Sequence, residues 1–168
     1  MAKRLTTILE LLRRSEGKAE KTFIQKAIYV LQNWLGGDSR YKFKLHYYGP
    51  YSPELSDDID ILSQLGLTEM VFNGHGYDII ITEEGLQFLG EHLEAYMLGT
   101  TKIERAISLI GTDDVRDMEL IGTTLYFSKL TGDELEITKL VNTVKPHFPD
   151  NTIKGTIKYL KKEGILSN

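Results

Sequence analysis

Apolar residues recur at helical spacing near the start of the chain. The first set is Leu5, Ile8, Leu9 and Leu12. Positions three and four apart share one face of a helix, so this set predicts a helix near Ala2 to Arg14. A second helix is expected from Lys21 to Leu35, because apolar residues cover most of its circumference and Gly36-Gly37 then stops it. The expected core residues are Ile28, Leu31 and Trp34 of this second helix, together with Leu62 further along the chain.

The next segment changes to a period of two. From Tyr41 to Tyr47 aromatic or aliphatic residues alternate with polar ones, which predicts a half-buried strand that Gly49-Pro50 ends. Ser52 is placed to cap a third helix with Pro53 at its first position, and that helix is expected to run to Leu65.

Two strand-like runs follow the third helix. They span Leu67 to Phe72 and Tyr77 to Ile81, and the turn from Asn73 to Gly76 between them is rich in residues that accept positive φ. The pair predicts a β hairpin. Helix, helix, strand, helix and hairpin is the order of a winged helix-turn-helix domain, which we therefore expect over residues 1–82.

From residue 83 onward the pattern is helical, and Thr82 is placed as the first N-cap. The apolar positions are Leu86, Leu89, Leu93, Met97, Ile103, Ala106, Ile107, Ile110, Val115, Met118, Ile121 and Leu125. Asp133 and Glu136 have the spacing of a capping box for a helix from about Glu134 to Val144, and a last helix is expected from Asn151 to Lys162. Residues 83–168 therefore form either a plain helical C-terminal region or one that includes a second helix-turn-helix-like unit. The predicted fold is mostly α with a small β hairpin.

Composition narrows the class of protein. The chain has no cysteine, which excludes thiol catalysis, zinc ribbons and a disulfide framework and suits a reducing compartment. Polar residues interrupt every apolar stretch well before the roughly 20 residues that a membrane span requires. We therefore expect a cytoplasmic protein with no membrane segment. Lys and Arg outnumber Asp and Glu before residue 50 and after residue 120, whereas acidic residues predominate in between.

Two segments carry a resemblance to a known family. One is Phe-Ile-Gln-Lys-Ala-Ile-Tyr-Val-Leu from Phe23 to Leu31, and the other is Tyr-Tyr-Gly-Pro-Tyr-Ser-Pro-Glu-Leu from Tyr47 to Leu55. Both resemble the YwgA-type uncharacterised proteins of bacteria and archaea and, more distantly, the phage-associated Panacea antitoxin domain. The resemblance implies a winged-helix-like fold without assigned activity, and some Panacea relatives act as toxin-neutralising partners. It implies no catalytic residue.

The sequence contains no recognisable constellation for catalysis. Its histidines are His46, His75, His92 and His147. They fall on different predicted elements without the i, i+4 pairing of a metalloprotease helix, and no nucleophile elbow, Walker loop or dinucleotide fingerprint occurs. We therefore expect a protein that is not an enzyme and uses no metal or cofactor.

Acidic and aromatic residues mark one candidate contact surface. The third helix carries Glu54, Asp57, Asp58 and Asp60. These carboxylates form either a solvated face near a helix N-terminus or a surface that faces a protein, and for the second alternative we select Asp57 and Asp58. Among the nearby aromatic residues, Tyr41 and Phe43 are assigned to the core, with Tyr47 as a further inward candidate. Tyr48 and Tyr51 are the aromatic candidates for partner binding.

Basic residues mark a second candidate surface on the last helix. Ile153, Ile157 and Leu160 predict its buried stripe, which turns four lysines outward. They are Lys154, Lys158, Lys161 and Lys162. Such a face is either plain solvated surface or a set of phosphate contacts for duplex DNA. The turn between the hairpin strands carries no Lys or Arg, which weakens any model in which that turn grips a DNA backbone.

These patterns favour two functional hypotheses. The first is a DNA-binding, transcription-regulator-like winged-helix protein that contacts duplex DNA through the lysine face. The alternative is a non-catalytic protein-protein interaction module, antitoxin-like in the sense of the Panacea resemblance, whose acidic third helix and tyrosines face a protein partner.

Overall fold

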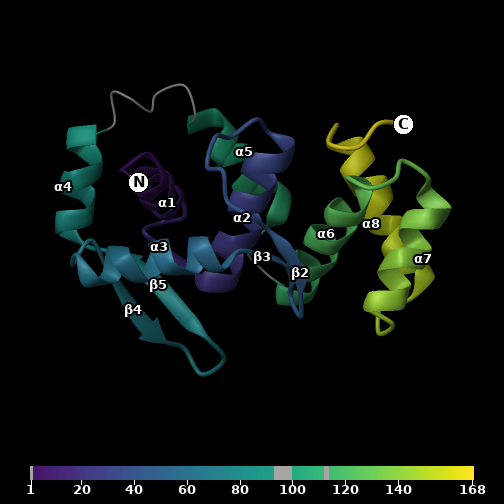
Figure 1. Ribbon diagram of the computed structural model, residues 1–168, viewed down its shortest axis with the longest axis horizontal. Helices are drawn as coiled ribbons and strands as arrows, with labels where there is room; N and C mark the ends of the chain where they lie inside the picture. Colours follow the sequence, from purple (N-terminus) through teal and green to yellow (C-terminus); the bar gives the residue numbers. More distant parts are fainter. Residues whose placement is uncertain (1, 93–99, 112–113) are drawn as a thin grey trace.

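The computed structural model describes residues 2–92, 100–111 and 114–168 (Figure 1). The helices are α1 (Ala2–Arg14), α2 (Lys21–Trp34), α3 (Pro53–Gln64), α4 (Glu83–His92), α5 (Thr100–Ile110), α6 (Val115–Ser128), α7 (Glu134–Val144) and α8 (Asp150–Lys162). The strands are β1 (Lys18–Glu20), β2 (Lys44–His46), β3 (Gly49–Tyr51), β4 (Thr68–Phe72) and β5 (Tyr77–Ile81). The expectation of a mostly α fold with a small hairpin is confirmed. None of the described helices is both long enough and apolar enough to cross a membrane.

The β4–β5 hairpin forms as expected and belongs to a three-stranded antiparallel sheet. The strand order is β1-β5-β4, with Ala19 and Met70 both paired to Ile79. In the turn, the Asn73 side chain accepts hydrogen bonds from two backbone amides, and Gly74 has a φ of 97°. The strand β1 was not predicted, because three residues between a helix end and a helix start are too few to show a period of two.

The predicted strand from Tyr41 to Tyr47 is wrong at both ends. Only Lys44–His46 is extended and paired, and its partner is Gly49–Tyr51, the segment expected to end the strand. The backbone of Tyr41 is satisfied by a side chain, since its amide donates to Gln32 Oε1 (2.7 Å) and its carbonyl accepts from Gln32 Nε2 (2.8 Å). A side-chain amide thus takes the hydrogen bonds that a neighbouring strand would otherwise supply.

The larger core surrounds α2, which contacts α1, α3, α5 and α6. Ile28, Leu31 and Leu62 are buried in it as expected. Trp34 is only half-buried, because it lies in the last turn of α2, where Lys129 Nζ is 4.4 Å from the centroid of its ring. Residues of α5 and α6, with Leu160 of α8, complete this core, and the predicted boundary at residue 82 stays a prediction. Leu93 and Met97, two of the predicted apolar positions, lie outside the described residues.

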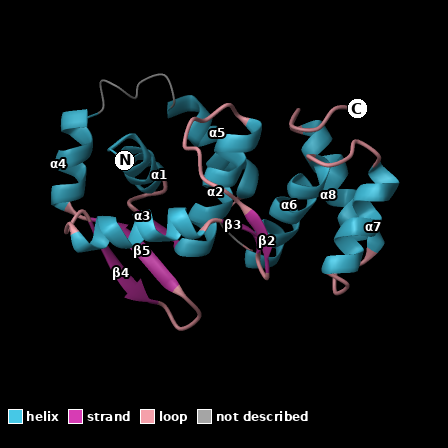
Figure 2. Cartoon of the chain, in the orientation of Figure 1, coloured by secondary structure: helices cyan, strands magenta, loops and turns pink. Residues whose placement is uncertain are grey.

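A second core holds α6, α7 and α8 together at the end of the molecule where the C-terminus lies (Figure 2). Its buried residues are Leu120, Phe127, Ile137, Val141, Phe148, Ile153 and Ile157. Asp133 caps α7 as predicted, accepting from the amides of Leu135 and Glu136. The Glu136 carboxylate does not complete a capping box, because it accepts a hydrogen bond from the Thr131 hydroxyl instead.

Candidate functional site

The lysine face of α8 is exposed at three of its four predicted positions. Lys154, Lys158 and Lys162 lie one turn apart on the solvent side of α8. The opposite side carries the predicted stripe of Ile153, Ile157 and Leu160, all buried. Lys161 differs, because it is half-buried and its ammonium lies 3.0 Å from the Glu134 carboxylate of α7. Its charge is therefore already paired, and the free lysine face consists of the other three residues.

Contacts with α7 and α5 fix the direction of α8. The α7–α8 turn, residues 145–149, is held by the Asn142 amide, which donates to the carbonyl of Phe148 (3.2 Å). Further along α8, the Tyr159 hydroxyl donates to the carbonyl of Leu109 in α5 (3.0 Å). Because both ends are anchored, the exposed lysines project from a rigid element.

The acidic surface of α3 is smaller than expected, because Asp58 points inward. Its carboxylate accepts a hydrogen bond from the Tyr41 hydroxyl (2.6 Å) and lies 3.1 Å from Arg4 Nε of α1. Asp58 is buried, so it stabilises the fold and offers nothing to a partner. Asp57 is exposed as predicted, and Asp60 pairs with Lys21 at 3.0 Å. The spacing of residues along α3 indicated this inward orientation, since position 58 falls in the apolar stripe formed by residues 55, 59 and 62.

The aromatic candidates lie on the β2–β3 hairpin, and they differ in exposure. Tyr48 is 57% exposed, and its choice as a contact residue stays a prediction. Tyr47 was considered a core candidate but is 79% exposed, because it lies in the turn between the strands. Tyr51 is only half-buried, with its ring centroid 5.2 Å from that of His46. Tyr47 and Tyr48 therefore form the exposed aromatic tip of the hairpin.

Three polar side chains hold this hairpin against the helices and a fourth, Glu119, pairs with one of them; we call the four the hairpin clamp. They are Gln25, Lys26, Glu119 and Lys145. Gln25 makes two hydrogen bonds to the backbone of Ser52, at 2.9 and 3.0 Å. The Lys26 ammonium donates to the carbonyl of Pro50 (3.3 Å).

The C-terminal half of the clamp reaches the same hairpin from α6 and the α7–α8 turn. The Lys145 ammonium lies 2.9 Å from Glu119 Oε1 and donates to the carbonyls of His46 and Tyr47. Glu119 also lies 3.7 Å from the exposed His147 ring. The hydrogen bond from Lys145 to the carbonyl of Tyr47 joins the N-terminal half of the chain to the C-terminal half, so the clamp couples the hairpin to the second core.

Glycine allows the hairpin to approach the clamp closely. Gly49 has a φ of 96°, and a Cβ on it would lie 3.3 Å from the carbonyl of Glu119 and 3.4 Å from Cε of Lys26. On α6, a Cβ on Gly122 would lie 2.9 Å from the Pro50 ring. The Gly49-Pro50 pair of the hairpin is thus a site of tight packing between backbone segments.

The pKa of Lys26 is lowered to about 8, chiefly because burial disfavours its charged form; the Glu119 carboxylate opposes this shift and the nearby Lys145 ammonium adds to it. Burying a charged group is unfavourable unless that group is paired. The buried charges of the clamp therefore lower the free energy of unfolding through their desolvation. The sequence did not reveal them as a site. The available signal was a lysine within a helix that is apolar on most sides and a glutamate between Met118 and Leu120.

The described residues contain no group of three or more His, Asp or Glu side chains arranged to hold a metal ion. In this part of the chain the acidic residues of α3 in particular do not converge, because Asp58 and Asp60 have separate basic partners.

A bacterial protein is similar to this chain over most of its length. The chain is 27% identical over 143 residues to the uncharacterized protein YwgA of Bacillus subtilis (strain 168), which covers 83% of each protein. No family model matches the chain. The similarity spans both halves of the molecule and supports the relationship to YwgA-type proteins that the Tyr-Gly-Pro-Tyr-Ser segment indicates.

Proposed function

We propose that this protein is a cytoplasmic, winged-helix, transcription-regulator-like protein that binds duplex DNA through the lysine face of α8. The order α1, β1, α2, α3 and β4–β5 hairpin supports the winged-helix part, as does the strand order β1-β5-β4. The α6–α8 unit supports DNA binding through α8, because α7, a short turn and α8 pack on their own core in the manner of a helix-turn-helix.

One observation carries the proposal. Lys154, Lys158 and Lys162 project from one side of α8 at intervals of one helical turn, and unlike Lys161 they form no ion pair with the residues that the structure describes. Ammonium groups in such a row suit a line of phosphates, and each contact adds to the salt dependence of binding. By contrast, α3 occupies the recognition position of the first domain but exposes Glu54 and Asp57 and no Lys or Arg. We infer that α3 does not read DNA.

The test is a titration with duplex DNA over a range of salt concentrations. Lys158→Ala with Lys162→Ala should weaken binding and lower the slope of log affinity against log salt by roughly 1 for each lysine that contacts a phosphate. Glu54→Gln with Asp57→Asn is the matched variant on α3, and it should leave binding unchanged or tighten it. Circular dichroism checks that both variants keep their helical content.

Two results would contradict this function. One is the absence of measurable duplex binding by the unaltered protein at low salt. The other is a loss of binding in the α3 variant with the α8 variant unaffected, which would place the DNA surface on the first domain.

A second candidate function is supported by the hairpin tip. Tyr47 and Tyr48 are exposed on a segment that the clamp holds rigidly, so little conformational entropy would be lost when a partner covers them. Exposed tyrosines on a preorganised loop are typical contact residues in protein interfaces. In this alternative the protein is a non-catalytic interaction module, with toxin neutralisation as one form of that role.

The two functions separate experimentally. Tyr47→Ser with Tyr48→Ser should abolish co-purification of a specific protein partner and leave duplex binding and its salt slope unchanged. A Leu135→Ser variant provides the control, because Leu135 is also exposed but lies on α7, away from the hairpin. A partner retained equally by all variants would exclude the hairpin tip as its contact surface.

A further inference from the structure

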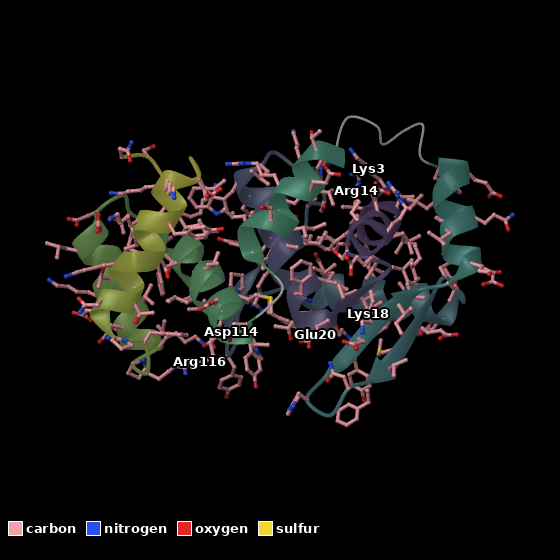
Figure 3. The ribbon with its side chains drawn as sticks, turned by 180° about the vertical axis from the view of Figure 1, so that it is seen from behind. Lys3, Arg14, Lys18, Glu20, Asp114 and Arg116 are labelled. Carbon is pink, nitrogen blue, oxygen red and sulfur yellow. The ribbon has the colours of Figure 1, made fainter. Side chains whose placement is uncertain are left out.

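A cavity of about 600 Å³ lies between the β1–β5–β4 sheet and the region where α5 and α6 meet. It is lined by β1, by residues of the β4–β5 hairpin and by Ile107, Val115 and Met118 of the two helices. Its volume is in the range of roughly 300–1,000 Å³ that is usual for sites of small organic ligands. Figure 3 shows Lys18 and Glu20 of β1 between the hairpin and the beginning of α6. None of these residues belongs to the lysine face or to the hairpin clamp.

One side of the cavity is apolar. Phe23 and Met118 line it and are almost fully buried, and Ile107 continues the same wall. An aromatic ring beside a methionine thioether suits an aromatic or aliphatic body, because both groups are polarisable and neither requires a hydrogen bond. The ligand that fits this wall has a hydrocarbon part.

The other side of the cavity carries carboxylates with acceptor capacity to spare. Asn73 donates one hydrogen bond to Glu20 Oε1 (3.3 Å) and one to Asp78 Oδ1 (3.1 Å), so it holds both carboxylates at the same rim. Lys18 approaches Asp78 only at 3.7 Å. Each carboxylate can accept about four hydrogen bonds, and the described contacts leave most of these sites open to a ligand.

The basic residues of the lining do not reverse this charge. Arg14 is already bound by two carboxylates, those of Glu10 at 2.5 Å and of Glu104. Glu16 adds a further acidic group at the exposed edge of the cavity. With Arg14 neutralised and a single lysine present, the rim has an excess of negative charge, which favours a cationic ligand.

We propose that this cavity binds a small amphipathic organic cation, namely a primary amine with an aromatic or short aliphatic body. Its ammonium group donates hydrogen bonds to Glu20 and Asp78, and its body lies against Phe23 and Met118. Because these residues come from α2, β1, β5 and α6, the bound amine bridges the sheet and the C-terminal helices and stabilises their packing by mass action.

The test uses 2-phenylethylamine as the probe with the full-length protein. The comparison ligands are 2-phenylethanol and 3-phenylpropanoate, which keep the body and change the charge, and methylamine, which keeps the charge and lacks the body. Binding is measured by calorimetry, and amide chemical shifts locate the site. We expect 2-phenylethylamine to bind at least roughly tenfold more tightly than any comparison ligand, because only it satisfies both sides of the cavity.

Variants connect the binding to named residues. Glu20→Gln with Asp78→Asn should weaken amine binding by roughly tenfold or more, since an amide keeps the shape but loses the charge. The matched control is Glu69→Gln with Glu83→Gln, which removes the same charge from residues outside the cavity lining. If the double variant does not fold, the proposal is tested by amine binding to the two single variants and by the amine-induced amide chemical shifts of the unaltered protein. Equal binding of the amine, alcohol and acid, or amine-induced shifts away from the cavity, would overturn the proposal.

Discussion

At the scale of single residues, the buried Lys26 of the hairpin clamp makes the free energy of unfolding depend on pH. Its ammonium is buried, donates to Pro50 and has a pKa of about 8 instead of 10.5. Because the folded-state pKa lies below the unfolded one, the folded protein releases this proton first as pH rises. The unfolded state then binds more protons, so the free energy of unfolding increases between about pH 8 and pH 10.5.

We predict that Lys26→Met removes this part of the pH dependence. The shift corresponds to roughly 3 kcal/mol between the two ends of that pH range. The unaltered protein should therefore gain stability relative to the variant as pH is raised from 7 to 10 (about 1.36 kcal/mol per unit of pKa shift), measured by chemical unfolding at each pH. Lys18→Met, at an exposed position, is the control. Parallel pH profiles for Lys26→Met and the unaltered protein would show that the amine is not desolvated in the folded state.

Asp58 gives a second prediction at the same scale. Its carboxylate joins Arg4 of α1 to Tyr41, so Asp58→Asn leaves a partly buried guanidinium without its counter-charge. We expect a loss of roughly 2 kcal/mol in the free energy of unfolding, because removing one partner of a buried pair exposes the cost of burying the other. The neighbouring Asp57→Asn, at an exposed position, should change stability by less than about 0.5 kcal/mol. Equal effects of the two substitutions in urea unfolding would contradict the inward orientation of Asp58.

At the scale of elements, local signals in the sequence predicted what local physics determines. Ser52 accepts a hydrogen bond from the Leu55 amide and starts α3 with Pro53 at its first position, as expected from capping rules. Asp133 does the same for α7. In contrast, β1 depends on β5, a strand partner far along the chain. The strand β3 pairs with the neighbouring β2, but Lys26 and α6, which are distant in sequence, pack against its Gly49-Pro50 segment. The clamp was missed for the same reason, since its bonds join residues that are distant in sequence.

The position of α2 leads to a prediction for that helix. Leu31 is 4% exposed, so Leu31→Asp places an unpaired carboxylate among apolar side chains. The expected loss is several kcal/mol, about 3 or more, which is a large part of the stability of a small protein. Leu135→Asp is the matched control, because Leu135 is exposed in the first turn of α7, where a negative charge is not unfavourable. Similar melting temperatures for the two variants would exclude Leu31 from the core.

At the scale of the whole molecule, the larger core joins both halves of the chain. Ile103, Leu109 and Leu125 from α5 and α6 belong to the same buried cluster as the residues of α1 and α2. Apolar surface shared in this way does not separate without exposure to water, which costs roughly 25 cal/mol per Å². The periodicity of each helix was visible in the sequence, but which helices cover which faces of α2 is a property of the folded chain.

This shared core predicts how fragments behave. A fragment of residues 1–82 keeps every element expected for the winged helix, yet it exposes the faces of α1 and α2 that α4, α5 and α6 cover. We expect it to lose cooperative thermal unfolding and to aggregate, because a large apolar patch is then in contact with water. A fragment of residues 1–128 retains α5 and α6 and should unfold cooperatively, although below the melting temperature of the full chain, since Leu120 and Phe127 lose the cover of α7 and α8. Calorimetry of both fragments checks the order. A fragment of residues 1–82 as stable as the full chain would mean that α2 does not depend on the C-terminal helices, and residue 82 would then be an independent folding boundary.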